Sequence, residues 1–149
     1  MSVQPLNVAF IILHYQNMQV TVESIEFLKR LQNISSAHII VVDNGSPNGT
    51  GERLAEKYAG DPIVTVKLLQ KNIGFASGNN KGYQFAKQQF GINCAVVMNS
   101  DVFLQDRQFL VKLQSNRDIW SKHSIIAPNV VNKEHKPLNP YLLKPKPNA

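Results

Sequence analysis

The sequence predicts an α/β fold in which a doubly wound, mostly parallel sheet lies between two layers of helices. Two observations predict it. Short apolar runs rich in β-branched residues recur along the chain, and segments with helical spacing lie between them. Runs that are continuously apolar are typical of strands buried on both faces of a parallel sheet. Alternation of such strands with helices implies right-handed crossovers and a ligand site outside the carboxyl ends of the strands.

The individual elements follow from these patterns. Five apolar runs are the predicted strands: Val8–Leu13, Ile39–Val42, Val64–Leu69, Ala95–Met98 and Ile125–Ala127. Helices are predicted where apolar residues recur at short helical spacings on one face. The residues that predict them are Val22, Ile25, Leu28 and Leu31; Leu54 and Tyr58; Tyr83, Ala86 and Phe90; and Phe109, Leu110 and Leu113.

Length and composition indicate one globular domain. The chain has 149 residues, of which 43% are hydrophobic, enough for one sizeable core. We place the domain at residues 1–128 and expect residues 129–149, where Pro and Lys are interspersed, to be extended. Cys94 is the chain's single cysteine, so no internal disulfide can form, and its apolar neighbours predict a buried thiol.

Charge and hydropathy narrow the partners and the location. The formal net charge of +6 favours anionic partners without choosing among nucleotides, phospholipid head groups and nucleic acid. The first apolar run is too short for a signal-peptide core or a membrane span. We therefore expect a soluble, cytoplasmic protein.

Polar segments follow four of the apolar runs, and two of them carry an aspartate. Asp43 could accept hydrogen bonds from a nucleotide base or a ribose hydroxyl, but it could equally end its strand in an Asx turn. Asp101 could bind a hard cation together with substrate phosphates, or it could cap a helix. Asp106 fits the simpler alternative, an N-cap for the helix that contains Phe109 and Leu113.

The other two segments allow the same choice between ligand binding and local structure. The glycine-rich residues 72–82 lead into a predicted helix, so their backbone N–H groups could approach a diphosphate. The alternative is a plain loop in which Gly82 permits close packing. After the first run, Tyr15 could stack on a base and Asn17 could bind a ribose, although such residues are also common in ordinary loops.

Taken together and in this order, the four segments resemble the inverting family 2 glycosyltransferases of the GT-A fold. The similarity is greatest to the rhamnosyltransferase-like members that build bacterial surface polysaccharides, and it extends from Val8 to about Asn132, the amino-terminal, donor-binding half of such enzymes. The resemblance implies nucleotide-binding roles for His14, Tyr15, Asn17, Asp43, Asn44, Gly74, Phe75, Gly78, Asn79, Asn99 and Ser100.

The resemblance also implies a metal site and leaves the catalytic base unassigned. Residues 99–101 occupy the place of the family's DXD motif, but Asn99 replaces the first carboxylate, so binding of Mg²⁺ or Mn²⁺ rests on Asp101. The family's general base lies in an acceptor-binding half further along the chain. Glu134 is not assigned that role, and we expect the base beyond Ala149, in a longer enzyme of which this chain is a truncated part.

The implied partners are a UDP- or dTDP-sugar donor and a glycan or lipid-linked acceptor, without nucleic acid. Peripheral contact with the inner face of the membrane is a further option. Two alternatives stay open. One is a sugar nucleotidyltransferase, although such enzymes open with a glycine-rich loop where this chain has His14 to Asn17. The other is a non-catalytic α/β nucleotide-binding module.

Overall fold

The computed structural model describes residues 6–104, 106–116, 122–132 and 134–137. The chain divides into two compact units, residues 1–115 and residues 116–149. All the named helices and strands belong to the first unit. In the second, an isolated antiparallel bridge joins Val131 to Pro137, and the amide of Asn132 donates to the carbonyl of Lys136 at 2.9 Å.

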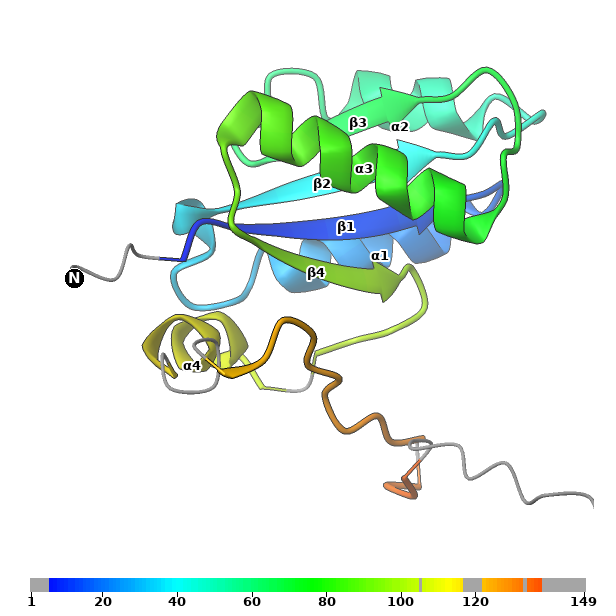
Figure 1. Cartoon of the computed structure of the whole chain (residues 1–149). Coiled ribbons are helices and arrows are strands. Elements are labelled where there is room, and N and C mark those ends of the chain that lie inside the picture. The colour runs from blue at the N-terminus through cyan, green and yellow to red at the C-terminus, as the bar shows by residue number, and fades with distance from the viewer. Residues whose placement is uncertain (1–5, 105, 117–121, 133, 138–149) are drawn as a thin grey trace, which may run out of the picture. The chain divides into compact units, whose positions relative to one another are not determined.

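Four parallel strands form the sheet, in the order β3-β2-β1-β4 (Figure 1). The strands are β1 (Val8–His14), β2 (Ala37–Asp43), β3 (Val64–Leu68) and β4 (Cys94–Asn99). The crossover from β3 to β4 passes over β2 and β1, which reverses the winding direction. The predicted doubly wound parallel sheet is therefore confirmed.

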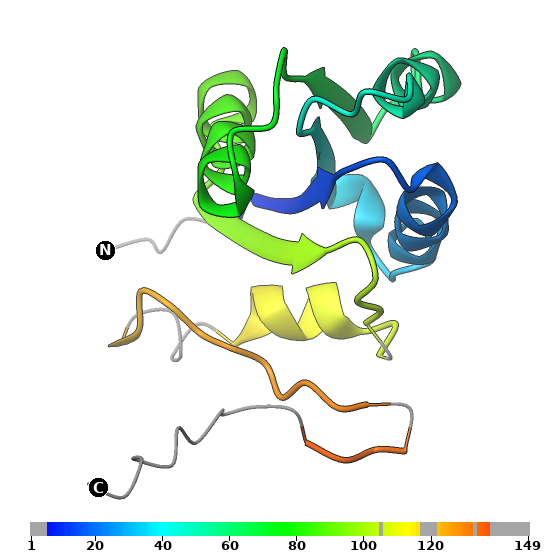
Figure 2. The same ribbon diagram turned by 90° about the vertical axis from the view of Figure 1, so that its right-hand side faces the viewer.

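Helices cover both faces of this sheet. They are α1 (Met18–Leu28), α2 (Thr50–Lys57), α3 (Phe75–Phe90) and α4 (Phe109–Ser115), with a short 3₁₀ helix η1 (Ile34–Ser36) before β2. Figures 1 and 2 show α3 on one face, with α1 and α2 together on the opposite face. This is the three-layer α/β/α arrangement that the alternation of elements predicts.

The core is densest around β1, the inner strand between β2 and β4. Val8–Ile12 and Ile39–Val42 are fully buried, which agrees with their continuous apolarity. Helix α3 packs closely on the sheet because it carries a glycine where it touches β1 and β2. A Cβ on Gly82 would lie 2.6 Å from Cγ2 of Ile11 and 2.8 Å from Cγ2 of Val42. Gly82 is therefore a packing residue, the simpler of its two interpretations.

Two predicted features of these elements are wrong. Ile125–Ala127 has no strand structure, and Ile125 is 89% exposed. An apolar run becomes a strand only where a paired strand supplies hydrogen-bond partners, and none of the strand pairings in the described residues includes this run. Tyr83 does not share the buried face of α3: it is 39% exposed, and the buried face is made of smaller residues, Gly78, Asn79, Gly82 and Ala86.

Two smaller expectations concern Cys94 and Asp106. Cys94 begins β4 as a buried free thiol, and burial raises its pKa. Asp106 lies just before α4 and accepts a hydrogen bond from the amide of Gln108 at 2.8 Å, so it stabilises the turn that leads into the helix. Within the described ranges, no helix is long and apolar enough to cross a membrane.

Candidate functional site

The polar residues predicted for the site meet at the carboxyl edge of the sheet. The strand register pairs His14 with Asp43 and Leu13 with Asn99, so Asp43 and Asn99 flank the end of β1. Neighbouring strands lie about 4.8 Å apart, which puts the ends of β2 and β4 at about 10 Å from each other. Asp101 follows Asn99 after one residue. Asp43 and Asn99, from distant parts of the sequence, thus lie along one edge of one sheet.

Asp43 is held in a single orientation at the end of β2. Its side chain is almost fully buried, and its two oxygens accept hydrogen bonds from the amide of Ser46 at 3.3 and 3.2 Å. The Asx-type turn that the sequence allowed is therefore present. Gly51, in the first turn of α2, lies directly against the carboxylate, and the positive end of this helix favours the negative charge.

Asn44 ties the end of β2 to the loop that precedes α3. Its Oδ1 accepts from the amide of Ile73 at 3.0 Å, and its Nδ2 donates to Oδ1 of Asn72 at 3.1 Å and to the carbonyl of Gly74 at 3.4 Å. The residue is only 3% exposed. These bonds engage both ends of the side-chain amide, so Asn44 holds this loop in place.

The start of α3 combines a left-handed glycine with an exposed aromatic ring. Gly74 is the N-cap, with φ of 87°, and its amide donates to Oδ1 of Asn72 at 2.9 Å. Phe75 follows and is 60% exposed. Gly78 instead faces the sheet, where a Cβ would lie 2.5 Å from Cδ1 of Leu13. Gly74 therefore allows the backbone conformation of the loop at the sheet edge, and Gly78 allows α3 to pack closely on β1.

Asn79 carries a buried oxygen that has no hydrogen-bond partner in the described part of the chain. Its amide nitrogen donates to the carbonyl of Phe75 at 3.0 Å, and the residue is 7% exposed. A buried acceptor without a donor costs free energy. Asn79 is therefore a group for which a ligand hydroxyl would supply the missing donor.

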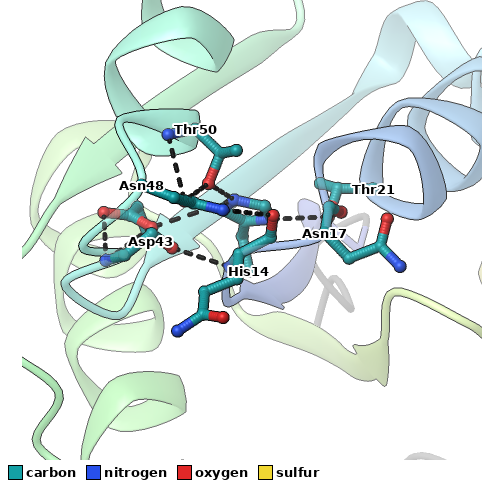
Figure 3. Close-up of polar contacts among 8 residues, drawn as sticks. His14, Asn17, Thr21, Asp43, Asn48 and Thr50 are labelled. Atoms are coloured by element: carbon teal, nitrogen blue, oxygen red, sulfur yellow. Dashed lines mark hydrogen bonds and ion pairs between the residues drawn. The ribbon is translucent and has the colours of Figure 1, made fainter.

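His14 lies inside the domain, behind the site edge (Figure 3). The side chain is fully buried; its Nδ1 lies 2.7 Å from Oγ1 of Thr21 and its Nε2 lies 2.9 Å from Oγ1 of Thr50. Burial lowers the pKa of His14, while Asp43, with Oδ1 at 3.9 Å from Nε2, opposes this shift. The geometry gives His14 protein partners at both nitrogens and no surface for direct contact with a nucleotide.

The segment after β1 forms a tight turn that presents Tyr15 to solvent. Tyr15 is 46% exposed, and Gln16 has an unusual left-handed φ of 63°. The amide of Gln16 donates to Oγ of Ser46 at 2.8 Å, and Nδ2 of Asn48 donates to its carbonyl at 3.0 Å. Asn17 is the N-cap of α1, where its Oδ1 accepts from the amide of Val20 at 3.3 Å.

The residues that join these loops were not predicted as functional. The fold brings Thr21 and Thr50 to the ring of His14, and it brings Asn48 to the carbonyl of Gln16. The sequence offers no local signal for these contacts. Ser46 had a weak signal because it lies within the polar segment that follows β2.

The groups available for a metal are few and exposed. Asn99 and Asp101 are exposed and Ser100 is partly buried. No group of three or more His, Cys, Asp or Glu side chains in the described residues could hold an ion by itself. Mg²⁺ is commonly bound through one or two carboxylates together with substrate phosphates. Asp101, with the amide oxygen of Asn99 nearby in sequence, fits that pattern when a diphosphate completes the coordination.

Residues 9–137 match the model of the family described as "Glycosyl transferase family 2". No curated protein sequence matches the chain. Among solved structures, the mannosyltransferase PcManGT from Pyrobaculum calidifontis, in complex with GDP-Man and Mn²⁺, is similar with a TM-score of 0.59 at 20% identity, over 73% of this chain and 33% of that one.

A second similar structure is S. aureus TarS in complex with UDP-GlcNAc, with a TM-score of 0.60 at 19% identity, over 79% of this chain and 32% of that one. The chain thus spans about a third of the length of these two solved chains. Their likeness shows that the fold is the GT-A fold. Because the family match covers most of the sequence, the chain belongs to glycosyl transferase family 2.

Proposed function

We propose that the chain is the donor-binding part of an inverting glycosyltransferase. It holds a nucleoside-diphosphate sugar, and the complete enzyme transfers the sugar to a hydroxyl of a glycan or lipid-linked acceptor in surface polysaccharide synthesis. A rhamnosyltransferase-like specificity agrees with the sequence motifs. The observation that carries the proposal is the placement of Asp43, Asn99 and the start of α3 at one edge of the sheet.

The nucleoside occupies the part of this edge near β1 and β2. Tyr15 is exposed and able to stack on the base, and the edge of the Asp43 carboxylate accepts a hydrogen bond from the base or ribose. Asn17 caps α1 through its oxygen, which leaves its amide nitrogen as the group to donate to a ribose hydroxyl. His14 and Asn44 act indirectly, because protein partners already engage both ring nitrogens of His14 and both ends of the Asn44 amide, whereas the two oxygens of Asp43 share the single amide of Ser46.

The diphosphate lies toward α3 and β4. The positive end of the α3 dipole and the backbone at Gly74 and Phe75 favour an anion here. The buried oxygen of Asn79 accepts a hydrogen bond from a hydroxyl of the ribose or the sugar. Asn99 and Ser100 complete this side of the pocket.

Asp101 binds Mg²⁺ or Mn²⁺ together with the diphosphate. When bound, the metal supplies Lewis-acid stabilisation of the negative charge on the departing nucleotide. The presence of Mn²⁺ in the complex of PcManGT supports a divalent ion. Inversion then requires a general base that deprotonates the acceptor hydroxyl, a role that we assign to none of the described residues. The reaction takes place in the cytoplasm, at the inner face of the membrane when the acceptor is a lipid.

A thermal-shift experiment tests this function with the chain as it is. One of UDP, dTDP and GDP, added with Mn²⁺, is expected to raise the melting temperature, because a ligand that binds only the folded state stabilises it. Asp101→Ala should abolish the part of the shift that depends on Mn²⁺, whereas Asp106→Ala, a change of the same charge near α4, should preserve it. A melting temperature that none of these nucleotides changes would refute the proposal.

A further inference from the structure

The hydrogen bonds around Asn48 and Thr50 determine which nitrogen of His14 carries a proton. Nδ2 of Asn48 donates to the carbonyl of Gln16, so Oδ1 of the same amide faces Thr50. Oγ1 of Thr50 donates to this oxygen at 2.7 Å. A hydroxyl has a single hydrogen. Toward His14, Thr50 can therefore only accept, and the donor is the Nε2–H of His14, 2.9 Å away.

The other side of the ring agrees with this assignment. A neutral imidazole that carries its proton on Nε2 has an acceptor at Nδ1. Oγ1 of Thr21 lies 2.7 Å from Nδ1, closer than the 3.2 Å that separates it from the carbonyl of Asn17. Because Nδ1 is then an acceptor, the single hydrogen of the Thr21 hydroxyl goes to the ring and not to the carbonyl of Asn17. With that assignment the bonds run in one direction, from α1 through His14 to the start of α2, along the contacts drawn in Figure 3.

The chain of bonds returns to the backbone two residues after His14. From His14 it passes to Thr50, then to Asn48, and from Nδ2 of Asn48 to the carbonyl of Gln16. Gln16 has a φ of 63°, and across it the amide of Asn17 donates to the carbonyl of Tyr15 at 2.8 Å. A side chain other than glycine persists in this region only when its surroundings hold it there. The bond from Asn48 to the carbonyl of Gln16, together with the bond from the amide of Gln16 to Oγ of Ser46, supplies that support.

We propose that His14 is a positioning residue whose Nε2–H directs the bonds through Thr50 and Asn48 that hold Gln16 in its left-handed turn and thereby set the pose of Tyr15 toward the bound nucleotide. The proposal rests on the proposed function, because it is the nucleotide that gives the Tyr15 ring a partner. It assigns His14 no contact with the ligand. His14 instead acts through the turn that follows it.

The protonation state is tested by long-range proton–nitrogen NMR of the imidazole rings at neutral pH. The expected spectrum has a neutral His14 that is protonated at Nε2. A ring protonated at Nδ1, or at both nitrogens, overturns the proposal. This readout needs no nucleotide, and the exchange experiments that follow test whether the ring acts on the turn.

The coupling to the turn is tested by amide hydrogen exchange. His14→Gln retains a donor that can reach Thr50, whereas His14→Asn ends closer to the backbone and cannot. Exchange at Gln16 and Asn17 should quicken about 10-fold in His14→Asn, as expected for a locally opened turn, and stay near the original rate in His14→Gln. Asn48→Asp, at an exposed position, replaces the donor to Gln16 with a carboxylate oxygen and retains the acceptor for Thr50. It should quicken exchange at Gln16 and Asn17 by the same factor of about 10, so the test does not depend on whether His14→Asn folds.

Thr21→Val is the matched control for this experiment. It removes the hydroxyl at Nδ1, which also lies 3.2 Å from the carbonyl of Asn17 but makes no bond to Gln16, so it should lower the melting temperature without quickening exchange at Gln16. Exchange quickened as much by Thr21→Val as by Asn48→Asp would overturn the proposal. So would an Asn48→Asp variant whose turn exchanges at the original rate.

A double-mutant cycle tests the link to the nucleotide. Asn48→Asp should weaken binding of UDP, dTDP or GDP, whichever the unmodified chain binds, by about 10-fold, equivalent to a single lost contact. In a Tyr15→Ala background the same change should have no further effect. An equal loss in both backgrounds contradicts an action through Tyr15. If the unmodified chain binds none of these nucleotides, the proposed function fails, while the NMR and exchange experiments still decide the role of His14.

Discussion

The carboxyl carbon of Asp43 lies so close to Gly51 that a Cβ on this glycine would be 2.4 Å away. Gly51→Ala must therefore displace the carboxylate at the site edge, although alanine is otherwise the better helix residue. We expect nucleotide affinity to fall by about 10-fold, the effect of one lost hydrogen bond to a charged group. Isothermal titration calorimetry measures it. Unchanged affinity would mean that Asp43 does not contact the ligand.

Gly82→Ala should do the opposite, with a loss of stability and no loss of affinity. Its new Cβ would meet side chains of β1 and β2 at 2.6 and 2.8 Å, in the interior of the sheet and not at its edge. Overpacking of this kind costs about 1–3 kcal/mol. Urea unfolding gives the free energy of unfolding, and titration of the folded protein gives the affinity. A stability equal to that of the unmodified chain would contradict the packing role of Gly82.

Asn44→Asp tests how the loop before α3 is held. The substitution retains an oxygen to accept from Ile73, but it replaces the donor to Asn72 and Gly74 with a carboxylate oxygen that faces other acceptors. We expect the free energy of unfolding to fall by about 1–3 kcal/mol, the usual cost of a buried polar group without its partner. Faster amide exchange at Gly74 should accompany it. Asn80→Asp, the same change at an exposed position of α3, is the control and should have a much smaller effect.

Stability should fall as the solution becomes mildly acidic. Burial lowers the pKa of His14 from its ordinary 6.5, and burial does the same for His38. Between pH 6.5 and these lowered values the unfolded chain binds more protons than the folded chain, so the free energy of unfolding decreases as the pH falls. Well above pH 6.5 the two histidines are neutral in the folded and the unfolded chain, so they no longer lower the free energy of unfolding.

Urea unfolding at a series of pH values checks this dependence. His14→Gln should remove part of the slope because the amide does not titrate. His38→Gln should remove a further part of the slope, because burial lowers the pKa of His38 as well. A slope that is equally steep in the His14→Gln variant would show that His14 is not the group responsible.

The fold was predictable wherever burial alone decides the structure. The runs at β1 and β2 are continuously apolar because both faces of these strands are covered, and this leaves a direct mark in the sequence. The run at Ile125–Ala127 has the same composition without a neighbouring strand, and composition cannot reveal that difference. Tyr83 was misplaced for a related reason: α3 lies so close to the sheet that its buried face accepts only small residues.

The sheet edge at which Asp43 and Asn99 lie was predictable from the sequence, whereas the contacts of the candidate residues were not. The rule that ligands bind at the carboxyl edge of parallel strands places Asp43, Asn99 and Asp101 together. It does not show that His14 is buried behind that edge, because its partners Thr21 and Thr50 come from two different helices. The left-handed conformation of Gln16 also gives no sequence signal, since glutamine has no preference for it.

The most direct test of a single nucleotide pocket at this edge is paramagnetic broadening of amide NMR signals by Mn²⁺ in the presence of the nucleotide that binds. The account predicts that signals of Tyr15, Asp43, Gly74 and Asp101 broaden together, that Ile92 and Val64 at the opposite edge stay sharp, and that Asp101→Asn removes the effect. Broadening around Asp101 that spares Asp43 and Tyr15 would contradict it.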